Sequence, residues 1–265
     1  MLDFNYHRPA TVEEAASLLA RAEDGMYLAG GHTLLPTMKQ RLASPSDLID
    51  LSAIPELAGI TIEGDTVTVG AMTSHAAVAS SAAVTRAIPA LAALAGNIGD
   101  PAVRNRGALG GSIANNDPAA DYPAALVGLG ATVKTTKREI AADDFFTGMF
   151  ETALDDGEII LSVSFPAPAK AAYVKFANPA SRYAIVGVFA AETADGVRVA
   201  VTGAGACVFR CTEMESALAD NFSPEALDHI DVPAEELNSD LHAGAEYRAH
   251  LVSVMAKRAV AAANG

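Results

Sequence analysis

The chain of 265 residues has no tryptophan, only two cysteines and no apolar run long enough to cross a membrane. Cys207 and Cys211 are too few for an iron–sulfur cluster, which usually needs four thiolates, and too few for a disulfide framework. No histidine lies near them in the sequence, which favours buried or free thiols over a metal site. The sequence therefore indicates the reducing cytoplasm as the compartment.

Basic residues are also scarce. Against 32 acidic residues stand 18 Lys and Arg, which gives a formal net charge of −14. Proteins that bind nucleic acid concentrate basic side chains to neutralise phosphates, so this balance argues against a nucleic-acid partner. The acidity could serve solubility or complement a basic partner subunit, and charge alone leaves both readings open. Met1 to Pro9 include Asp3 and Arg8 without a following apolar stretch, so no secretory signal peptide is expected.

The first 55 residues carry the pattern of a small α/β layer. Thr11 stands three residues before Glu14, and apolar residues follow at helical spacing, which predicts a capped helix. Residues 26–29 form a short apolar segment that runs into a pair of glycines, and residues 48–51 form a second one. We expect two strands there and a subdomain over residues 1–55.

From residue 56 the pattern predicts a larger α+β subdomain that ends near residue 168. Gly64-Asp65 separates two short alternating segments, which is a strong hairpin signal. An alanine-rich stretch over residues 74–94 predicts helices broken at Pro89, and a stretch over residues 96–123 is rich in Gly, Asn, Asp and Pro. Strands are expected at residues 131–135 and 159–165.

A Pro-Ala-Pro-Ala segment at residues 166–169 marks a domain boundary. Beyond it, residues 173–176, 184–191 and 197–204 alternate like an antiparallel meander, and Asp195-Gly196 turns the last two strands. The pattern becomes mainly helical from Cys211 to the end. We therefore predict an α+β protein with domains at residues 1–168 and 169–265, the second an antiparallel sheet with helices.

Two glycine-rich segments carry the chemical signal. One is Ala29-Gly30-Gly31-His32-Thr33-Leu34-Leu35-Pro36, and the other runs from Gly107 through Gly110-Gly111-Ser112 to Pro123. Glycines let consecutive backbone N–H groups converge on an anion, so two such loops could hold one dinucleotide from both sides. Two unrelated surface turns are the alternative. Neither segment has the phosphate-loop lysine or the G-x-G-x-x-G spacing of the Rossmann fingerprint.

Three long motifs, in order along nearly the whole chain, resemble the flavoprotein subunits of molybdenum hydroxylases, the carbon monoxide dehydrogenase, xanthine dehydrogenase and aldehyde oxidase family. They are residues 29–39, residues 99–121 with Gly99-Asp100-Pro101 and Asp117-Pro118-Ala119-Ala120-Asp121, and residues 239–248. The resemblance implies an FAD-binding fold of the p-cresol methylhydroxylase and vanillyl-alcohol oxidase type, in two subdomains, followed by a family-specific C-terminal domain.

The resemblance also implies a function in electron transfer. A subunit of this kind takes electrons from the [2Fe-2S] clusters of a small partner subunit and passes them from FAD to a terminal acceptor, while a large molybdopterin-binding subunit oxidises the substrate. The assembly would be a dimer of heterotrimers, cytoplasmic, with a place at the inner face of the membrane left open. The alternatives are a stand-alone FAD-dependent reductase or oxidase of the same fold and a non-redox nucleotide-sensing module.

The resemblance assigns the FAD contacts residue by residue. Gly30 to Thr33 would hold the pyrophosphate, Asp121 would face hydroxyls rather than phosphate, and Lys175 and Tyr183 would reach the isoalloxazine. No residue is expected to act as a catalytic acid or base, and no metal ligand is expected. The full expected set is Ala29, Gly30, Gly31, His32, Thr33, Leu34, Ile98, Gly99, Ala108, Leu109, Gly110, Gly111, Ser112, Asn115, Asp121, Ile160, Lys175 and Tyr183.

The sequence departs from the family at two positions. Ala108 stands where many relatives carry a hydroxyl residue, which removes one hydrogen bond to the cofactor. Arg182 precedes Tyr183 where an acidic residue is common, so the acceptor side of the flavin would differ. Arg104 and Arg106 are expected to fix the loop or face a partner rather than contact substrate.

Overall fold

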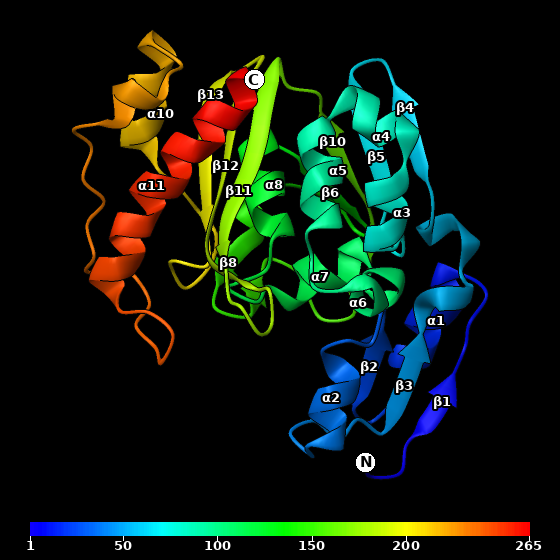
Figure 1. Cartoon of the computed structure of the whole chain (residues 1–265). Helices are drawn as coiled ribbons and strands as arrows, with labels where there is room; N and C mark the ends of the chain where they lie inside the picture. Colours follow the sequence, from blue (N-terminus) through cyan, green and yellow to red (C-terminus); the bar gives the residue numbers. More distant parts are fainter.

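A computed structural model describes residues 1–265 and shows a small lobe at the N-terminal end joined to a larger body (Figure 1). The body holds two antiparallel sheets with helices between and outside them, and the C-terminal helix lies along its outer side. The predicted α+β class is confirmed. The predicted boundaries at residues 55 and 168 stay predictions.

The small lobe is a three-stranded parallel sheet with two helices. Its order is β1 (Asn5–His7), β3 (Asp47–Asp50) and β2 (Gly25–Leu28), with α1 (Val12–Leu19) and α2 (Leu34–Lys39) between strands. The Thr11 side chain accepts a hydrogen bond from the backbone N–H of Glu14, as the capping pattern predicts. Strand β1 was not predicted, because three residues with no buried side chain leave no hydrophobic pattern.

The centre of the body is a five-stranded antiparallel sheet. Its order is β4 (Ile60–Glu63), β5 (Thr66–Gly70), β10 (Ile160–Pro166), β6 (Thr132–Thr135) and β7 (Glu139–Ala141). The hairpin at Gly64-Asp65 is confirmed, because Glu63 pairs with Thr66. The sheet's apolar face shares one core of 32 buried residues with the helices.

The central helices are short, and Pro89 separates two of them as predicted. They are α3 (His75–Ser80), α4 (Ala82–Ala87), α5 (Pro89–Gly96), α6 (Pro101–Arg106), α7 (Leu109–Asn115), α8 (Tyr122–Leu129) and α9 (Ala142–Phe145). Two small strands, β8 (Phe146–Gly148) and β9 (Glu151–Thr152), and three 3₁₀ turns, η1 (Leu51–Ala53), η2 (Pro55–Leu57) and η3 (Pro224–Leu227), complete the connections.

The second glycine-rich segment is not the loop that its composition predicts. Gly110, Gly111 and Ser112 lie inside helix α7. Glycine has a low intrinsic preference for helix, but tertiary packing overrides it here, because Leu109 and Ile113 of the same helix are fully buried in the central core. The prediction of a second glycine loop was therefore wrong in its local conformation.

The C-terminal part is a four-stranded antiparallel meander of β11 (Lys170–Ala177), β12 (Ala184–Thr193), β13 (Gly196–Thr202) and β14 (Phe209–Arg210). The turn at Asp195-Gly196 is confirmed by the pairing of Thr193 with Gly196. Helices α10 (Thr212–Asp220) and α11 (Ala245–Asn264) cover its outer face. The helical tail predicted from Cys211 is interrupted by an irregular stretch over residues 228–244.

Strand β12 lies in the middle of the body and faces two cores. Phe189 and Ala191 point into the central core against α8, and Val188 and Ala190 point into a second core under α10 and α11. Eight consecutive residues of the strand are buried. Burial on both faces explains why the strand reads as a continuous apolar run.

Replacing Phe189 with alanine tests this arrangement. The ring is fully buried, so its loss removes apolar contact and leaves a cavity between the meander and α8. We expect the free energy of unfolding to fall by about 3–5 kcal/mol, measured by chemical denaturation. A loss below about 1 kcal/mol would contradict the shared core.

Candidate functional site

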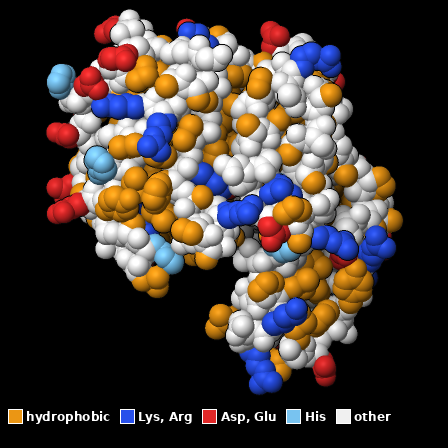
Figure 2. All heavy atoms as spheres, in the orientation of Figure 1, with side chains coloured by type: hydrophobic (Ala, Val, Ile, Leu, Met, Phe, Trp, Pro, Cys, Tyr) orange, Lys and Arg blue, Asp and Glu red, His pale blue; other side chains and the backbone are white.

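A cleft of about 700 Å³ lies where the small lobe meets the body. Its walls come from residues 26–37 of the lobe and, in the body, from residues 98–121, 154–160 and 181–183. Figure 2 shows the hollowed step at this junction and several Lys and Arg side chains along it, although the chain as a whole is acidic. The volume falls within the range of about 300–1,000 Å³ that small-molecule sites occupy.

The structure brings most of the expected site residues together in this cleft. Sixteen of the eighteen line it, namely Ala29, Gly30, Gly31, His32, Thr33, Leu34, Ile98, Gly99, Ala108, Gly110, Gly111, Ser112, Asn115, Asp121, Ile160 and Tyr183. The other two, Leu109 and Lys175, lie behind the cleft wall. The expected residues come from five separate stretches of the sequence, so the fold and not local sequence gathers them.

The turn between β2 and α2 offers a row of free hydrogen-bond donors. The backbone N–H groups of Gly30, Gly31, His32 and Thr33 donate to no backbone carbonyl of the chain. All four residues line the cleft. Successive N–H groups without an internal acceptor form a concavity that suits an anion.

This turn lies against the end of helix α6 and against helix α7. A Cβ atom added to Gly30 would lie 2.4 Å from the carbonyl oxygen of Arg106, and one added to Gly111 would lie 2.9 Å from the Cβ of Ala29. Gly111 N–H, in the first turn of α7, also donates to no carbonyl. The lobe and the body therefore meet where both present free donors to the cleft. At Gly30 and Gly111 the approach is too close for a side chain.

Two arginines hold the turn at Gly99. Arg104 donates from Nη1 to the carbonyl oxygens of Ile98, at 2.9 Å, and Gly99, at 3.1 Å, and Arg182 donates to the same Gly99 oxygen at 3.3 Å. The expectation that Arg104 fixes the loop is confirmed. Arg182 itself lines the cleft with a φ of 63°, a left-handed conformation that is uncommon outside glycine.

Asp121 lies in the cleft wall within a buried polar group. It accepts a hydrogen bond of 2.5 Å from the Tyr173 hydroxyl, and its Oδ1 lies 3.0 Å from Lys175 Nζ. Lys175 also donates to the carbonyl oxygen of Asn97 at 2.9 Å. Burial raises the pKa of the Asp121 carboxyl, whereas the Lys175 charge and the Tyr173 hydrogen bond act against that rise.

These contacts place Lys175 against Asp121, so the lysine would act on a ligand through that carboxylate. Tyr173 was missed by sequence reasoning. The signal that could have found it is strand periodicity, since Tyr173 and Lys175 are two residues apart in β11 and project from the same face.

Sequence reasoning also missed His75 at the start of α3. It lines the cleft and is 4% exposed, its Nδ1 has no hydrogen-bond partner, and its ring lies 5.3 Å from that of Tyr122. Burial, with smaller contributions from His32 and Arg104, lowers the pKa of His75 to about 4. His75 is therefore neutral at pH 7. A single histidine in an alanine-rich stretch carries no sequence signal of this position.

Comparisons with known proteins decide the family. The family model described as "FAD binding domain in molybdopterin dehydrogenase" matches residues 2–168. The nicotine 6-hydroxylase medium subunit of Paenarthrobacter nicotinovorans is 38% identical over 96% of this chain and 95% of its own. The carbon monoxide dehydrogenase medium chain of Hydrogenophaga pseudoflava is 37% identical over 98% of this chain and 96% of its own.

The chain belongs to the FAD-binding molybdopterin dehydrogenase family. The structure of carbon monoxide dehydrogenase from Hydrogenophaga pseudoflava matches it with a TM-score of 0.89 over 99% of this chain and 97% of that one. The predicted recognition, the fold type, the cofactor FAD and the assignment as an oxidoreductase subunit are confirmed. No helix is both long and apolar enough to span a membrane.

The residues of this family member fit FAD. The cofactor is long, with an anionic diphosphate between two flat ring systems, and it needs donors in the middle of an elongated site. The free N–H groups of Gly30–Thr33 and Gly111 supply such donors in the cleft. The same cleft is also lined by Ile98, Gly99 and Tyr183 and, near the Gly157 carbonyl, by Tyr27 and Ile160.

Replacing His75 with asparagine tests its neutral state. Because the pKa of His75 is lowered from 6.5 to about 4, protonation favours the unfolded chain, so wild-type stability falls as pH decreases from 6.5 to 4. Over this pH range we expect the free energy of unfolding of His75→Asn to decrease by up to about 3 kcal/mol less than that of the wild type. Denaturation at several pH values measures it, and equal slopes for both proteins would refute the assignment.

Proposed function

We propose that this chain is the electron-transfer subunit of a molybdenum hydroxylase complex, which receives electrons from [2Fe-2S] clusters of a partner subunit and passes them through FAD to a terminal acceptor. The observation that carries the proposal is the meeting of the Gly30–Thr33 turn with α7, both with free N–H donors in one cleft. The full-length similarity to medium subunits of named hydroxylases and dehydrogenases supports it.

We infer how FAD would lie from the chemistry of the groups that line the cleft and from the family resemblance. The diphosphate would accept hydrogen bonds from Gly30–Thr33 and Gly111. The ribityl hydroxyls would face Asp121 and Asn115, since a carboxylate repels phosphate but accepts hydrogen bonds from hydroxyls. The isoalloxazine would then lie toward Ile98, Gly99 and Tyr183, and the adenine toward Ile160. Leu109 would support α7 from behind, and His32, Leu34 and Ala108 would complete the walls.

The protein's contribution to redox chemistry is electrostatic. Bound FAD supplies reversible electron transfer, and the surrounding groups tune its potential. Lys175 keeps Asp121 compensated, so the buried carboxylate presents little net negative charge to the cleft. Arg182, placed beside Tyr183 in the cleft wall, adds positive charge at the flavin end.

The partners belong to the proposal. The relatives' names, medium subunit and medium chain, support a place beside other subunits. We infer a large molybdopterin-binding subunit that binds the substrate, a small [2Fe-2S] subunit and a dimer of such heterotrimers, located in the cytoplasm. The formal net charge of −14 would complement basic faces on these partners.

A tagged chain expressed in its native host tests the function directly. We expect flavin absorption bands in the purified protein and two co-purifying subunits that bring molybdenum and iron. Flavin without partners would favour the stand-alone reductase or oxidase. A colourless chain that does not bind added FAD and brings no partners would contradict both readings.

Replacing Gly30 with alanine tests the contact between lobe and body. The new methyl group would lie 2.4 Å from the Arg106 oxygen, which forces the turn away from the end of α6. We expect the dissociation constant for FAD to rise at least about tenfold, measured by flavin fluorescence titration. Gly96→Ala is the matched control, since its methyl group would meet only Ala79, at 3.7 Å. Equal affinities in the two variants would argue against the proposed cradle.

A further inference from the structure

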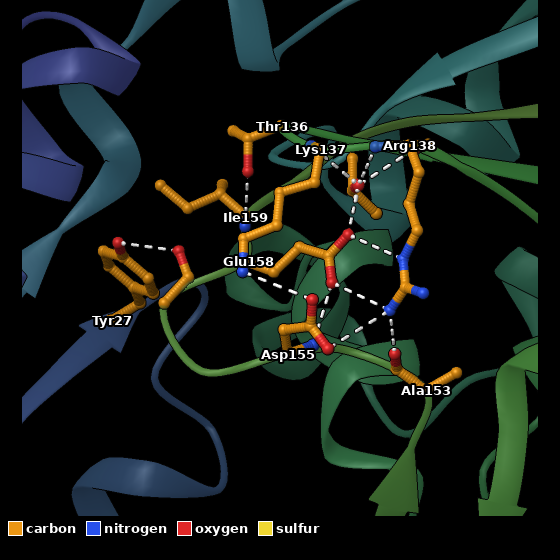
Figure 3. Close-up of polar contacts among 10 residues, drawn as sticks. Tyr27, Thr136, Lys137, Arg138, Ala153, Asp155, Glu158 and Ile159 are labelled. Atoms are coloured by element: carbon orange, nitrogen blue, oxygen red, sulfur yellow. Dashed lines mark hydrogen bonds and ion pairs between the residues drawn. The ribbon is translucent and has the colours of Figure 1, made fainter.

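A buried carboxylate supports the part of the cleft wall that residues 154–160 form. The side chain of Glu158 is 0% exposed and its residue lines the cleft. Its oxygens accept hydrogen bonds from the Thr135 hydroxyl at 2.5 Å and from the backbone N–H of Asp155 at 2.8 Å (Figure 3). Arg138 approaches both oxygens at 3.4 Å. Both oxygens of the carboxylate therefore accept hydrogen bonds from the protein, and the carboxylate does not itself contact a ligand.

The two side-chain donors come from the turn between β6 and β7. Thr135 and Arg138 lie at its two ends, and Arg138 also donates to the carbonyl oxygen of Ala153 at 2.6 Å. One step further, Thr136 donates its backbone N–H to Ile159 at 2.9 Å and accepts the Ile159 N–H on its hydroxyl at 3.2 Å. These bonds fasten residues 153–159 to the hairpin (Figure 3).

The fastened segment forms one end of the cleft. Leu154, Ile159 and Ile160 line it there with apolar side chains. Tyr27 of strand β2 packs against the same apolar cluster as Ile159, and its hydroxyl donates to the Gly157 carbonyl at 3.3 Å, which ties the lobe to this segment. This apolar part of the cleft wall suits a flat heteroaromatic ring.

We propose that Glu158, with Arg138 and Thr135, is a positioning residue that sets the adenine end of the cleft and thereby makes the site prefer a dinucleotide over a mononucleotide. The inference rests on the proposed function, because the direction of FAD in the cleft comes from it. The stabilisation comes from local hydrogen bonds, because a buried carboxylate with all its donors in place holds residues 153–159 rigidly. Loss of its charge would weaken the hydrogen bonds that Thr135, Arg138 and the Asp155 N–H donate to it.

Glu158→Gln tests the inference, because the amide keeps the volume and removes the charge. Affinities for FAD, ADP and FMN are measured by calorimetry on the deflavinated full-length chain. ADP carries the adenine and the diphosphate, and FMN carries the flavin and a phosphate. We expect affinity for FAD and ADP to fall about tenfold and affinity for FMN to stay within about twofold.

Two further variants separate positioning from general damage. Lys137→Gln removes an exposed ion pair to Asp155, 3.3 Å long, in the same turn, and we expect no change in any affinity. Arg138→Gln, at a half-exposed side chain, is expected to lower the affinities for FAD and ADP in the same way but by less. It tests the inference if Glu158→Gln does not fold.

The outcomes that overturn the inference are distinct. Equal losses for FAD, ADP and FMN would show a general structural role, and unchanged FAD and ADP affinities would show no role. A wild-type chain that binds none of the three would instead refute the proposed function, and the inference with it.

Discussion

The contact between the Gly30 turn and the Arg106–Gly107 backbone is the constraint on which the rest of the structure depends. It joins the small lobe to the body without an intervening side chain, so the two walls of the cleft meet at the bottom of the site. Any Cβ atom at Gly30 would separate them. Gly111 of α7, which carries the body's free N–H donor, lies against Ala29 of the same turn, so the approach of the lobe to the body also brings the two sets of donors to one anion-binding centre.

Two buried carboxylates flank that centre, and each is neutralised by its own cation. Asp121 pairs with Lys175 and receives the Tyr173 hydroxyl, and Glu158 pairs with Arg138 and receives the Thr135 hydroxyl. Burying such pairs adds little net stability, but removing one partner is costly because a charge is left uncompensated. Here these pairs make the cleft rigid, since each one supports part of the cleft wall from behind.

The sequence predicts the architecture well where the signal is local. The capped helix at Thr11, the hairpin at Gly64 and the meander after residue 168 follow from short patterns, and the motifs around Gly30 and Asp121 identify the family. The helix at α7 was missed, because its glycines are chosen for packing and not for helix preference. His75, Tyr173 and Glu158 were missed too, because burial beside a cleft is decided by contacts far apart in the sequence.

Hydrogen exchange of the backbone amides, with and without FAD, tests the central claim most directly. If the turn at Gly30 and the start of α7 hold one diphosphate together, the amides of residues 30–33 and of Gly111 exchange fast in the deflavinated chain and become protected together when FAD binds. Protection of only one of the two elements, or of neither, would contradict the account.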